Sequence, residues 1–90
     1  MLAAGGPLRI EPRVQDSLNS LDLEINDVRA CLCVLDVREI HKEEPDETVE
    51  GKQVYVFRTR YEGELLYVKV SIRLPKDHDL KVLSFKHWGE

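Results

Sequence analysis

The sequence predicts one α+β domain, in which two N-terminal helices pack on one face of a four-stranded antiparallel sheet. Apolar residues recur at helical spacing over residues 12–35 and alternate with polar residues over residues 53–74, and glycine or proline separates the extended runs. Helices followed by strands with short links are typical of the α+β class. The 90 residues provide a single core. We expect residues 1–8 to form a flexible terminus and residues 9–90 to form the domain.

Two helices are expected before the sheet. Pro12 suits the first turn of a helix, and the first helix is expected from about Pro12 to Leu21 because its apolar residues share one stripe. These residues are Val14, Leu18 and Leu21. The second helix is expected to begin near residues 24–26, and its helical period is the strongest in the chain. Its apolar positions are Ile25, Val28, Leu32 and Leu35.

Extended segments are expected after the helices, at residues 37–42, 53–60, 65–74 and 80–87. Gly63 follows Glu62 and supplies the glycine that a tight hairpin turn needs. Residues 43–47 are acidic apart from Pro45, and a proline inside a strand removes a donor of the hydrogen-bond ladder. We therefore expect these five residues to form an exposed loop.

One face of the predicted sheet should be apolar and the other cationic. From residue 65 to residue 74 every second residue is apolar, namely Leu66, Val68, Val70, Ile72 and Leu74. Side chains alternate between the two faces of a strand, so Tyr67, Lys69 and Arg73 should meet solvent. The last strand ends in Lys86 and His87. The sequence thus predicts an open, cationic sheet face, and we expect function to lie there.

The charge of the chain is divided unevenly between its halves. Residues 1–51 carry five Lys and Arg against twelve Asp and Glu, a net charge of −7. Residues 52–90 carry eight against five, a net charge of +3, so that the whole chain has −4. An acidic half before a basic half can reflect a nucleic-acid surface on one side, because phosphate binding depends on Lys and Arg. It can equally be a solvated mixture of charges.

The sequence offers no signal for a cofactor, a metal or a membrane. Phosphate-loop, dinucleotide-binding and hydrolase-elbow motifs are missing. His41, Glu43, Glu44 and Asp46 lie together, but an acidic loop is usually solvated, so we expect no metal site. Cys31 and Cys33 point to different faces of a helix, and we expect Cys31 to pack as a small apolar residue of a reduced, intracellular chain. With neither a signal peptide nor a membrane span, we expect a cytoplasmic protein.

The cationic face suits binding of RNA and stabilisation of charge on a phosphodiester. RNA carries its own nucleophile, the 2′-hydroxyl, so an enzyme has to hold the backbone, assist proton transfer and neutralise developing charge. Lysines supply the charge, and a tyrosine or histidine can handle a proton. Each residue also has a structural explanation, since Lys69 and Arg73 are ordinary solubilising residues on a strand. Trp88 either caps the core or stacks on a base, and capping is the expectation.

Three short segments of the chain resemble a known family: residues 21–25, residues 63–70 and residues 82–86. They are similar to the MqsR family of bacterial toxins, and the resemblance covers about Leu21 to Lys86. It implies a RelE-like fold and metal-independent cleavage of messenger RNA, with a cognate antitoxin protein as partner. The family's catalytic lysines and tyrosine fall on Lys42, Tyr67 and Lys86, and its glutamine falls approximately on Gln53.

The resemblance and the cationic face together define the expected site. Lys42, Tyr67 and Lys86 are the expected catalytic residues, and the expected RNA-binding residues are Arg58, Lys69, Arg73 and His87. The helix pattern and the hairpin also resemble a group of small uncharacterised domains of the same RelE-like superfamily. A second hypothesis therefore stays open, in which the same fold is a non-catalytic protein-interaction module whose acidic half binds a basic partner.

Overall fold

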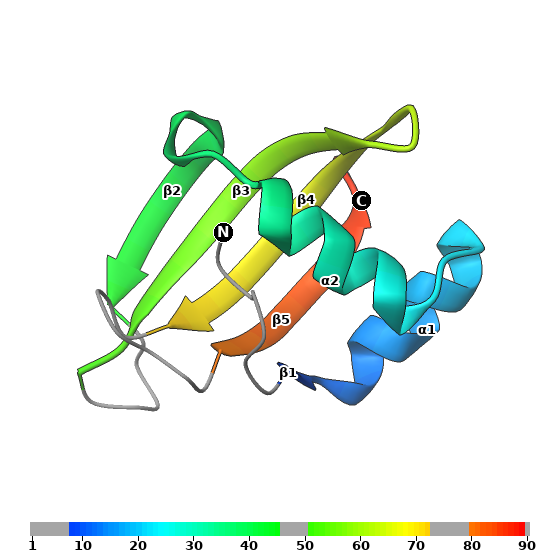
Figure 1. Cartoon of the computed structure of the whole chain (residues 1–90). Helices are drawn as coiled ribbons and strands as arrows, with labels where there is room; N and C mark the ends of the chain where they lie inside the picture. The colour runs from blue at the N-terminus through cyan, green and yellow to red at the C-terminus, as the bar shows by residue number, and fades with distance from the viewer. Residues whose placement is uncertain (1–7, 46–50, 73–79, 90) are drawn as a thin grey trace.

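The structure is a computed structural model, and it describes residues 8–45, 51–72 and 80–89. Its helical elements are α1 (Pro12–Leu21), α2 (Ile25–Val34) and the short 3-10 helix η1 (Val37–Glu39). Its strands are β1 (Leu8–Ile10), β2 (Ile40–Pro45), β3 (Gln53–Tyr61), β4 (Glu64–Ile72) and β5 (Leu80–His87). The predicted α+β class is therefore correct (Figure 1). The expected flexible terminus lies outside the described residues apart from Leu8, the first residue of β1.

The sheet differs from the prediction, because it has five strands and is mixed rather than four-stranded and antiparallel. Its strand order is β1-β5-β4-β3-β2. The strands β2 to β5 form antiparallel pairs, whereas β1 runs parallel to β5 with Leu8 opposite Leu80. Strand β1 was not predicted from the sequence because three residues are too few to display a period of two.

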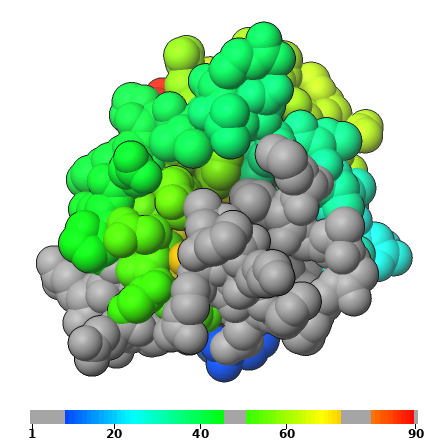
Figure 2. Space-filling model, turned by 60° about the vertical axis from the view of Figure 1, so that its left-hand side comes forward, coloured from blue at the N-terminus to red at the C-terminus, as the bar shows by residue number. Residues whose placement is uncertain are grey.

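The prediction of a loop over residues 43–47 was wrong for residues 43–45, and residues 46 and 47 lie outside the described residues. Residues 43–45 belong to β2, and Pro45 pairs with Gln53. β2 is the outermost strand on its side of the sheet, so it needs hydrogen bonds on one side only. A proline whose missing N–H faces away from the neighbouring strand costs the sheet nothing there. The green side chains of η1 and β2 lie at the surface in Figure 2, as expected for an edge strand.

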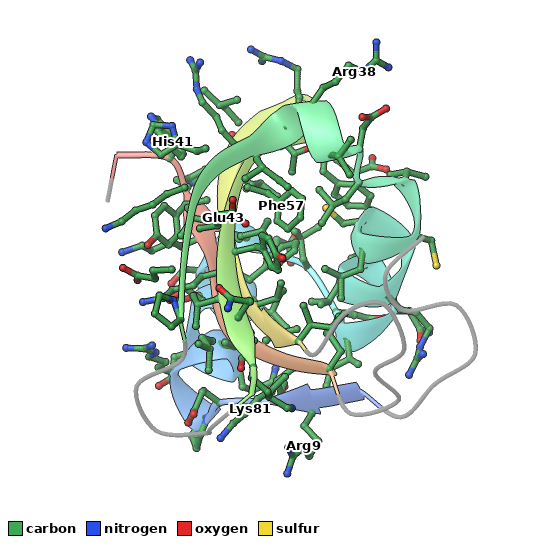
Figure 3. All side chains as sticks on the ribbon, turned by 90° about the vertical axis from the view of Figure 1, so that its left-hand side faces the viewer. Arg9, Arg38, His41, Glu43, Phe57 and Lys81 are labelled. Atoms are coloured by element: carbon green, nitrogen blue, oxygen red, sulfur yellow. The ribbon has the colours of Figure 1, made fainter. Side chains whose placement is uncertain are left out.

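The core lies on one face of the sheet, called here the inner face, which α2 covers (Figure 1). The predicted apolar row of β4 is buried there, and Phe57 of β3 lies between the sheet and α2 (Figure 3). The fully buried residues of this cluster include Leu66, Val68 and Val70 from β4, Val82 and Phe85 from β5, Val14 and Leu18 from α1, and Val28 and Leu32 from α2. Both predicted helices thus contribute to a single core, and the opposite face of the sheet is called here the outer face.

The helix α1 lies beside β5 and follows β1 along that side of the sheet (Figure 1). The pairing of β4 with β5 shifts register between Lys69 and Val70, so Leu83 is the extra residue of a β-bulge in β5. Arg13 of α1 donates a hydrogen bond from Nε to the Leu83 carbonyl oxygen at 2.8 Å. The N–H of Glu11 donates to the Val82 carbonyl at 3.1 Å. The start of α1 therefore satisfies backbone acceptors of the bulge.

The Asp27 carboxylate joins the beginning of α2 to the end of β3. Its Oδ2 accepts the Glu24 N–H at 2.8 Å, which forms half of a capping box, and its Oδ1 accepts the Tyr61 hydroxyl at 2.9 Å. Helices leave their first N–H groups without partners inside the helix, so this carboxylate stabilises the first turn of α2. Its bond to Tyr61 also holds α2 in position against the sheet.

The β3–β4 hairpin has the predicted tight turn at Glu62 and Gly63. Both residues have positive φ, 52° and 80°, as the two central residues of a type I′ turn require. That turn matches the twist of the flanking strands and fixes their register, in which Tyr61 lies opposite Glu64. In the part of the chain that the structure describes, no helix is both long enough and apolar enough to span a membrane.

Replacement of Asp27 is expected to destabilise the fold more than an ordinary surface substitution. Asp27→Ala removes the cap and leaves the Tyr61 hydroxyl without this acceptor, and we expect the free energy of unfolding to fall by about 1–3 kcal/mol. Urea denaturation followed by circular dichroism measures this change. Asp16→Ala, an exposed residue of α1, is the matched control. Equal midpoints for the two variants would contradict the role given to Asp27.

The fold is expected to lose stability as the pH rises from about 9 to about 12. Burial raises the pKa of the Cys31 thiol from 9.0 to about 12. Burial and the hydrogen bond to Asp27 raise the pKa of Tyr61 from 10.0 to about 12. Between the unfolded and the folded pKa values the unfolded state binds fewer protons, so the free energy of unfolding falls as the pH rises.

Urea midpoints at pH 8 and pH 11 test this dependence. The Cys31→Ala/Tyr61→Phe double variant lacks both titrating groups and should show a smaller loss between the two pH values than the parent chain does. An equal loss in parent and variant would show that other groups cause the alkaline dependence.

Candidate functional site

The outer face of the sheet carries two rows of aligned side chains. Residues that pair directly across antiparallel strands point to the same face. One row contains Arg58, Tyr67 and Lys86, from β3, β4 and β5. The adjacent row contains Lys42, Val56, Lys69 and Ser84, from β2 to β5. The three expected catalytic residues therefore lie on the same face of the sheet, in neighbouring rows.

A β-bulge in β2 decides that Lys42 belongs to this face. Ile40 pairs with Phe57 on the inner face and Lys42 pairs with Val56 on the outer face, so His41 is the extra residue. In a regular strand, residues two apart share a face, and Lys42 would lie on the inner side with Ile40. The extra residue lets Ile40 pack against the core while Lys42 points outward. His41 lies on the side of the sheet opposite α2 (Figure 3).

A pocket of about 430 Å³ opens on the outer face. Its lining residues are His41 and Lys42 from β2, Val56 from β3, Tyr67 from β4, and Trp88 and Gly89 after β5. The Lys42 side chain is 62 % exposed, so its ammonium group is accessible, although it lies 3.6 Å from the Glu44 carboxylate. Such an exposed pair contributes little to stability and is readily exchanged for another anion.

The rings and cations around the pocket contact one another. The Lys86 Nζ lies 5.2 Å from the centre of the Tyr67 ring, and the Arg58 guanidinium lies 5.4 Å from the Trp88 ring. Trp88 also meets the Tyr67 ring at 5.9 Å between centres and the His41 ring edge-on at 4.8 Å. We call these six residues the outer-face cluster: His41, Lys42, Arg58, Tyr67, Lys86 and Trp88.

The expectation that Trp88 caps the core was wrong, because its ring belongs to the outer-face cluster and lines the pocket. After β5 the backbone N–H of Trp88 donates a hydrogen bond to the Leu65 carbonyl oxygen at 2.9 Å. This bond anchors the Trp88 backbone beside the beginning of β4, and the indole contacts the Tyr67 ring. Sequence reasoning also missed His41 as a site residue, because nothing in the sequence of β2 reveals the bulge that places it there.

The remaining expected site residues divide into three groups. Lys69 lies on the outer face opposite Val56, beside the pocket. His87 pairs with Leu66 on the inner side of the sheet, and its Nε2 lies 3.0 Å from the Glu64 carboxylate, so it is separate from the outer-face cluster. Gln53 pairs with buried Ile72 and also faces the inner side. Arg73 lies outside the described residues.

A metal site or a reactive thiol among the described residues would be an alternative candidate site. In residues 8–45, 51–72 and 80–89, no three His, Cys, Asp or Glu side chains are grouped closely enough to hold a metal ion. Cys31 is buried, as expected for a small apolar residue, whereas Cys33 is exposed, and the two cysteines form no disulfide. Burial raises the pKa of Cys31 to about 12, which makes this thiol a poor nucleophile.

Comparisons with protein-family models, with curated proteins and with solved structures find no match to this chain.

Substitutions in the outer-face cluster are expected to leave the fold intact, since these side chains lie outside the core. We expect Lys42→Ala, Tyr67→Phe and Lys86→Ala each to change the free energy of unfolding by no more than about 0.5–1 kcal/mol. Leu66→Ala, which removes a fully buried side chain on the same strand as Tyr67, should cost about 2–5 kcal/mol. Urea denaturation compares the four variants. If all four variants lost a similar amount of unfolding free energy, the outer-face cluster would be structural.

Proposed function

We propose that the protein is a metal-independent endoribonuclease of the toxin–antitoxin type, which cleaves messenger RNA by means of the RNA 2′-hydroxyl. The observation that supports this proposal is the position of three side chains. Lys42 and Tyr67 line one pocket, and the Lys86 ammonium lies against the Tyr67 ring. They come from three strands that are distant in sequence, and the bulge at His41 is needed to bring the first of them to this face.

The proposed reaction needs groups that bind a phosphate and handle protons. The 2′-oxygen attacks the adjacent phosphorus, the bond from phosphorus to the 5′-oxygen of the next nucleotide breaks, and the products carry a 2′,3′-cyclic phosphate and a 5′-hydroxyl. The 2′-hydroxyl loses a proton and the 5′-oxygen gains one. In the transition state the non-bridging oxygens gain negative charge, which nearby cations stabilise strongly.

The outer-face cluster can supply each of these roles. The ammonium groups of Lys42 and Lys86 stabilise the charge on the phosphate. The Tyr67 hydroxyl orients the phosphate or relays a proton. His41 lines the same pocket, and its imidazole is a second group that can accept or donate a proton. Arg58 and Lys69 flank the pocket and would bind neighbouring phosphates.

The proposal has consequences for partners and location. An endoribonuclease of this type needs a cognate antitoxin, and a partner that covers the outer-face cluster would block the pocket. Messenger RNA as substrate implies action in the cytoplasm. The wholly or partly exposed lysines and arginines on the outer face give an antitoxin or an RNA the same cationic surface to recognise.

A non-catalytic protein-interaction module is the second candidate function. Two exposed apolar side chains support it: Val34, the last residue of α2, is 70 % exposed, and Val37, the first residue of η1, is 66 % exposed. Apolar side chains exposed to solvent are candidate contacts for a protein partner. In this alternative the outer-face cluster has no reaction to perform.

Incubation of the purified protein with mixed-sequence RNA in EDTA tests the enzyme proposal. We expect cleavage by the parent chain to give 2′,3′-cyclic phosphate ends. Lys42→Ala and Lys86→Ala should each lower the rate by about 10²-fold or more, because each removes a charge that stabilises the transition state. Tyr67→Phe and His41→Gln should show which of the two groups handles a proton, since general acid–base catalysis contributes about 10²–10⁴-fold.

Arg38→Ala is the control for loss of a positive charge, because Arg38 lies on η1 and pairs with Asp36 at 2.9 Å. It should cleave as the parent does. An inert parent with a normal circular dichroism spectrum would overturn the enzyme proposal and leave the interaction module. Equal activity of parent and a Lys42→Ala/Tyr67→Ala/Lys86→Ala variant would show that the cleavage comes from a contaminant.

A further inference from the structure

We propose that the pocket on the outer face is a base-stacking subsite, which holds one unpaired nucleobase of single-stranded RNA against the Trp88 ring. The proposal rests on the proposed function in taking RNA as the ligand, and it adds a residue and a role that the cleavage reaction does not require. Four observations carry it: the chemistry of the pocket lining, the fixed position of the indole, the burial of Val56 and the arrangement of the cations.

The pocket is lined by apolar and aromatic side chains that binding of a phosphate would not require. Phosphate is held by cations and N–H donors, but of the lining residues only Lys42 carries a permanent positive charge. Val56, Tyr67 and Trp88 offer an apolar side chain and two aromatic rings. The volume of about 430 Å³ lies in the ~300–1,000 Å³ range of small-molecule pockets. Flat aromatic groups inside such a pocket suit a flat aromatic ligand.

The indole is held in position before any ligand binds. The hydrogen bond from the Trp88 N–H to the Leu65 carbonyl anchors its backbone. The rings of His41 and Tyr67 and the Arg58 guanidinium contact the indole from three other strands. A side chain that is already ordered loses little conformational entropy when a base stacks on it. Trp88 is therefore a rigid platform rather than a loose surface side chain.

Val56, an apolar residue of the pocket lining, explains why transfer of a base from water into the pocket would be favourable. Val56 points to the outer face and lines the pocket, and it is only 3 % exposed, so this part of the lining is apolar and well enclosed. A ring placed over this residue would be shielded from solvent on that side, and burial of apolar ring surface is favourable. Phosphate, which is strongly hydrated, would gain nothing from contact with a valine.

The cations stand around the rings in the way that single-strand binding proteins use them. Lys42 lines the pocket, Lys69 lies opposite Val56 on the neighbouring strand, and Arg58 and Lys86 lie against Trp88 and Tyr67. Binding of single-stranded RNA combines aromatic platforms for bases with a cationic surface for the backbone. We infer that the phosphates on either side of the stacked base contact these cations.

A probe that cannot be cleaved separates this inference from the proposed reaction. The probe is a fully 2′-O-methylated RNA hexamer, which lacks the 2′-hydroxyl nucleophile. The comparison probe is an abasic hexamer with the same phosphates and no bases. Trp88 is the only tryptophan in the chain, so its fluorescence reports directly on the pocket. We expect the base-bearing hexamer to change the emission and the abasic hexamer to leave it unchanged.

Binding of fluorescein-labelled hexamers to variants gives the second readout. Trp88→Ala should weaken binding of the base-bearing hexamer by about 5- to 100-fold, the loss of one base–aromatic stack, and Trp88→Phe should restore much of it. Both variants should bind the abasic hexamer as the parent does. Lys42→Ala should weaken binding of both hexamers. The control variant Arg38→Ala should bind both hexamers with the affinity of the parent chain.

The outcomes are distinct. Equal binding of the two hexamers by the parent, or unchanged binding by Trp88→Ala, would overturn the base-stacking subsite even if the protein cleaves RNA. Tryptophan quenching that requires bases would support the subsite even if no RNA is cleaved, and in that case the protein binds single-stranded RNA without acting as a nuclease.

Discussion

The alternation of side chains along β4 is the constraint on which the rest of the molecule depends. Every second residue of this central strand enters the core, and the residues between them face outward. A slip of one residue in its pairing would place Tyr67 and Lys69 in the core and expose Leu66 and Val68. The hydrophobic free energy of the apolar row therefore fixes not only the fold but also the face on which the cationic residues appear.

The neighbouring strands follow this alternation only because two bulges correct them. In β2 the bulge at His41 allows Ile40 to pack inward and Lys42 to point outward. In β5 the bulge at Leu83 allows Val82 and Phe85, which are three residues apart, to enter the same core. The hydrogen bond from Arg13 to the Leu83 carbonyl shows that α1 supports this second irregularity. The outer-face cluster is thus assembled by departures from regular strand geometry.

Much of the fold could be predicted from the sequence, because its periods are long and regular. The helix predicted for residues 12–21 and the strand predicted for residues 80–87 match α1 and β5, and the row from Leu66 to Ile72 is buried as predicted. Strand β1 could not be predicted, because its three residues display no period. Pro45 was misread because the rule against proline in strands does not hold at the edge of a sheet, and edge position is a property of the whole fold.

The candidate site was less accessible to prediction than the fold. The face of Tyr67 and Lys69 follows from alternation along β4, and the structure agrees with it, whereas Lys86 reaches the same face only because of the bulge at Leu83. The positions of His41 and Trp88 depend on a bulge and on a turn after β5, and neither has a signature in the local sequence. His87 was expected beside Lys86, although adjacent strand residues point to opposite faces. Bulges and turns therefore determine which residues form the candidate site, and composition and spacing do not reveal them.

The pairing of β1 with β5 also determines how the chain reaches this structure. The β3–β4 hairpin joins residues that are close in sequence and needs only a two-residue turn, so we expect it to form early. Leu8 and Leu80 are joined across almost the whole chain, and closing so long a loop is entropically costly and slow. Until β1 arrives, β5 presents an unpaired edge to other chains. The three residues of β1 thus pair late with β5 and cover its free edge, which protects this side of the sheet from association with other chains once folding is complete.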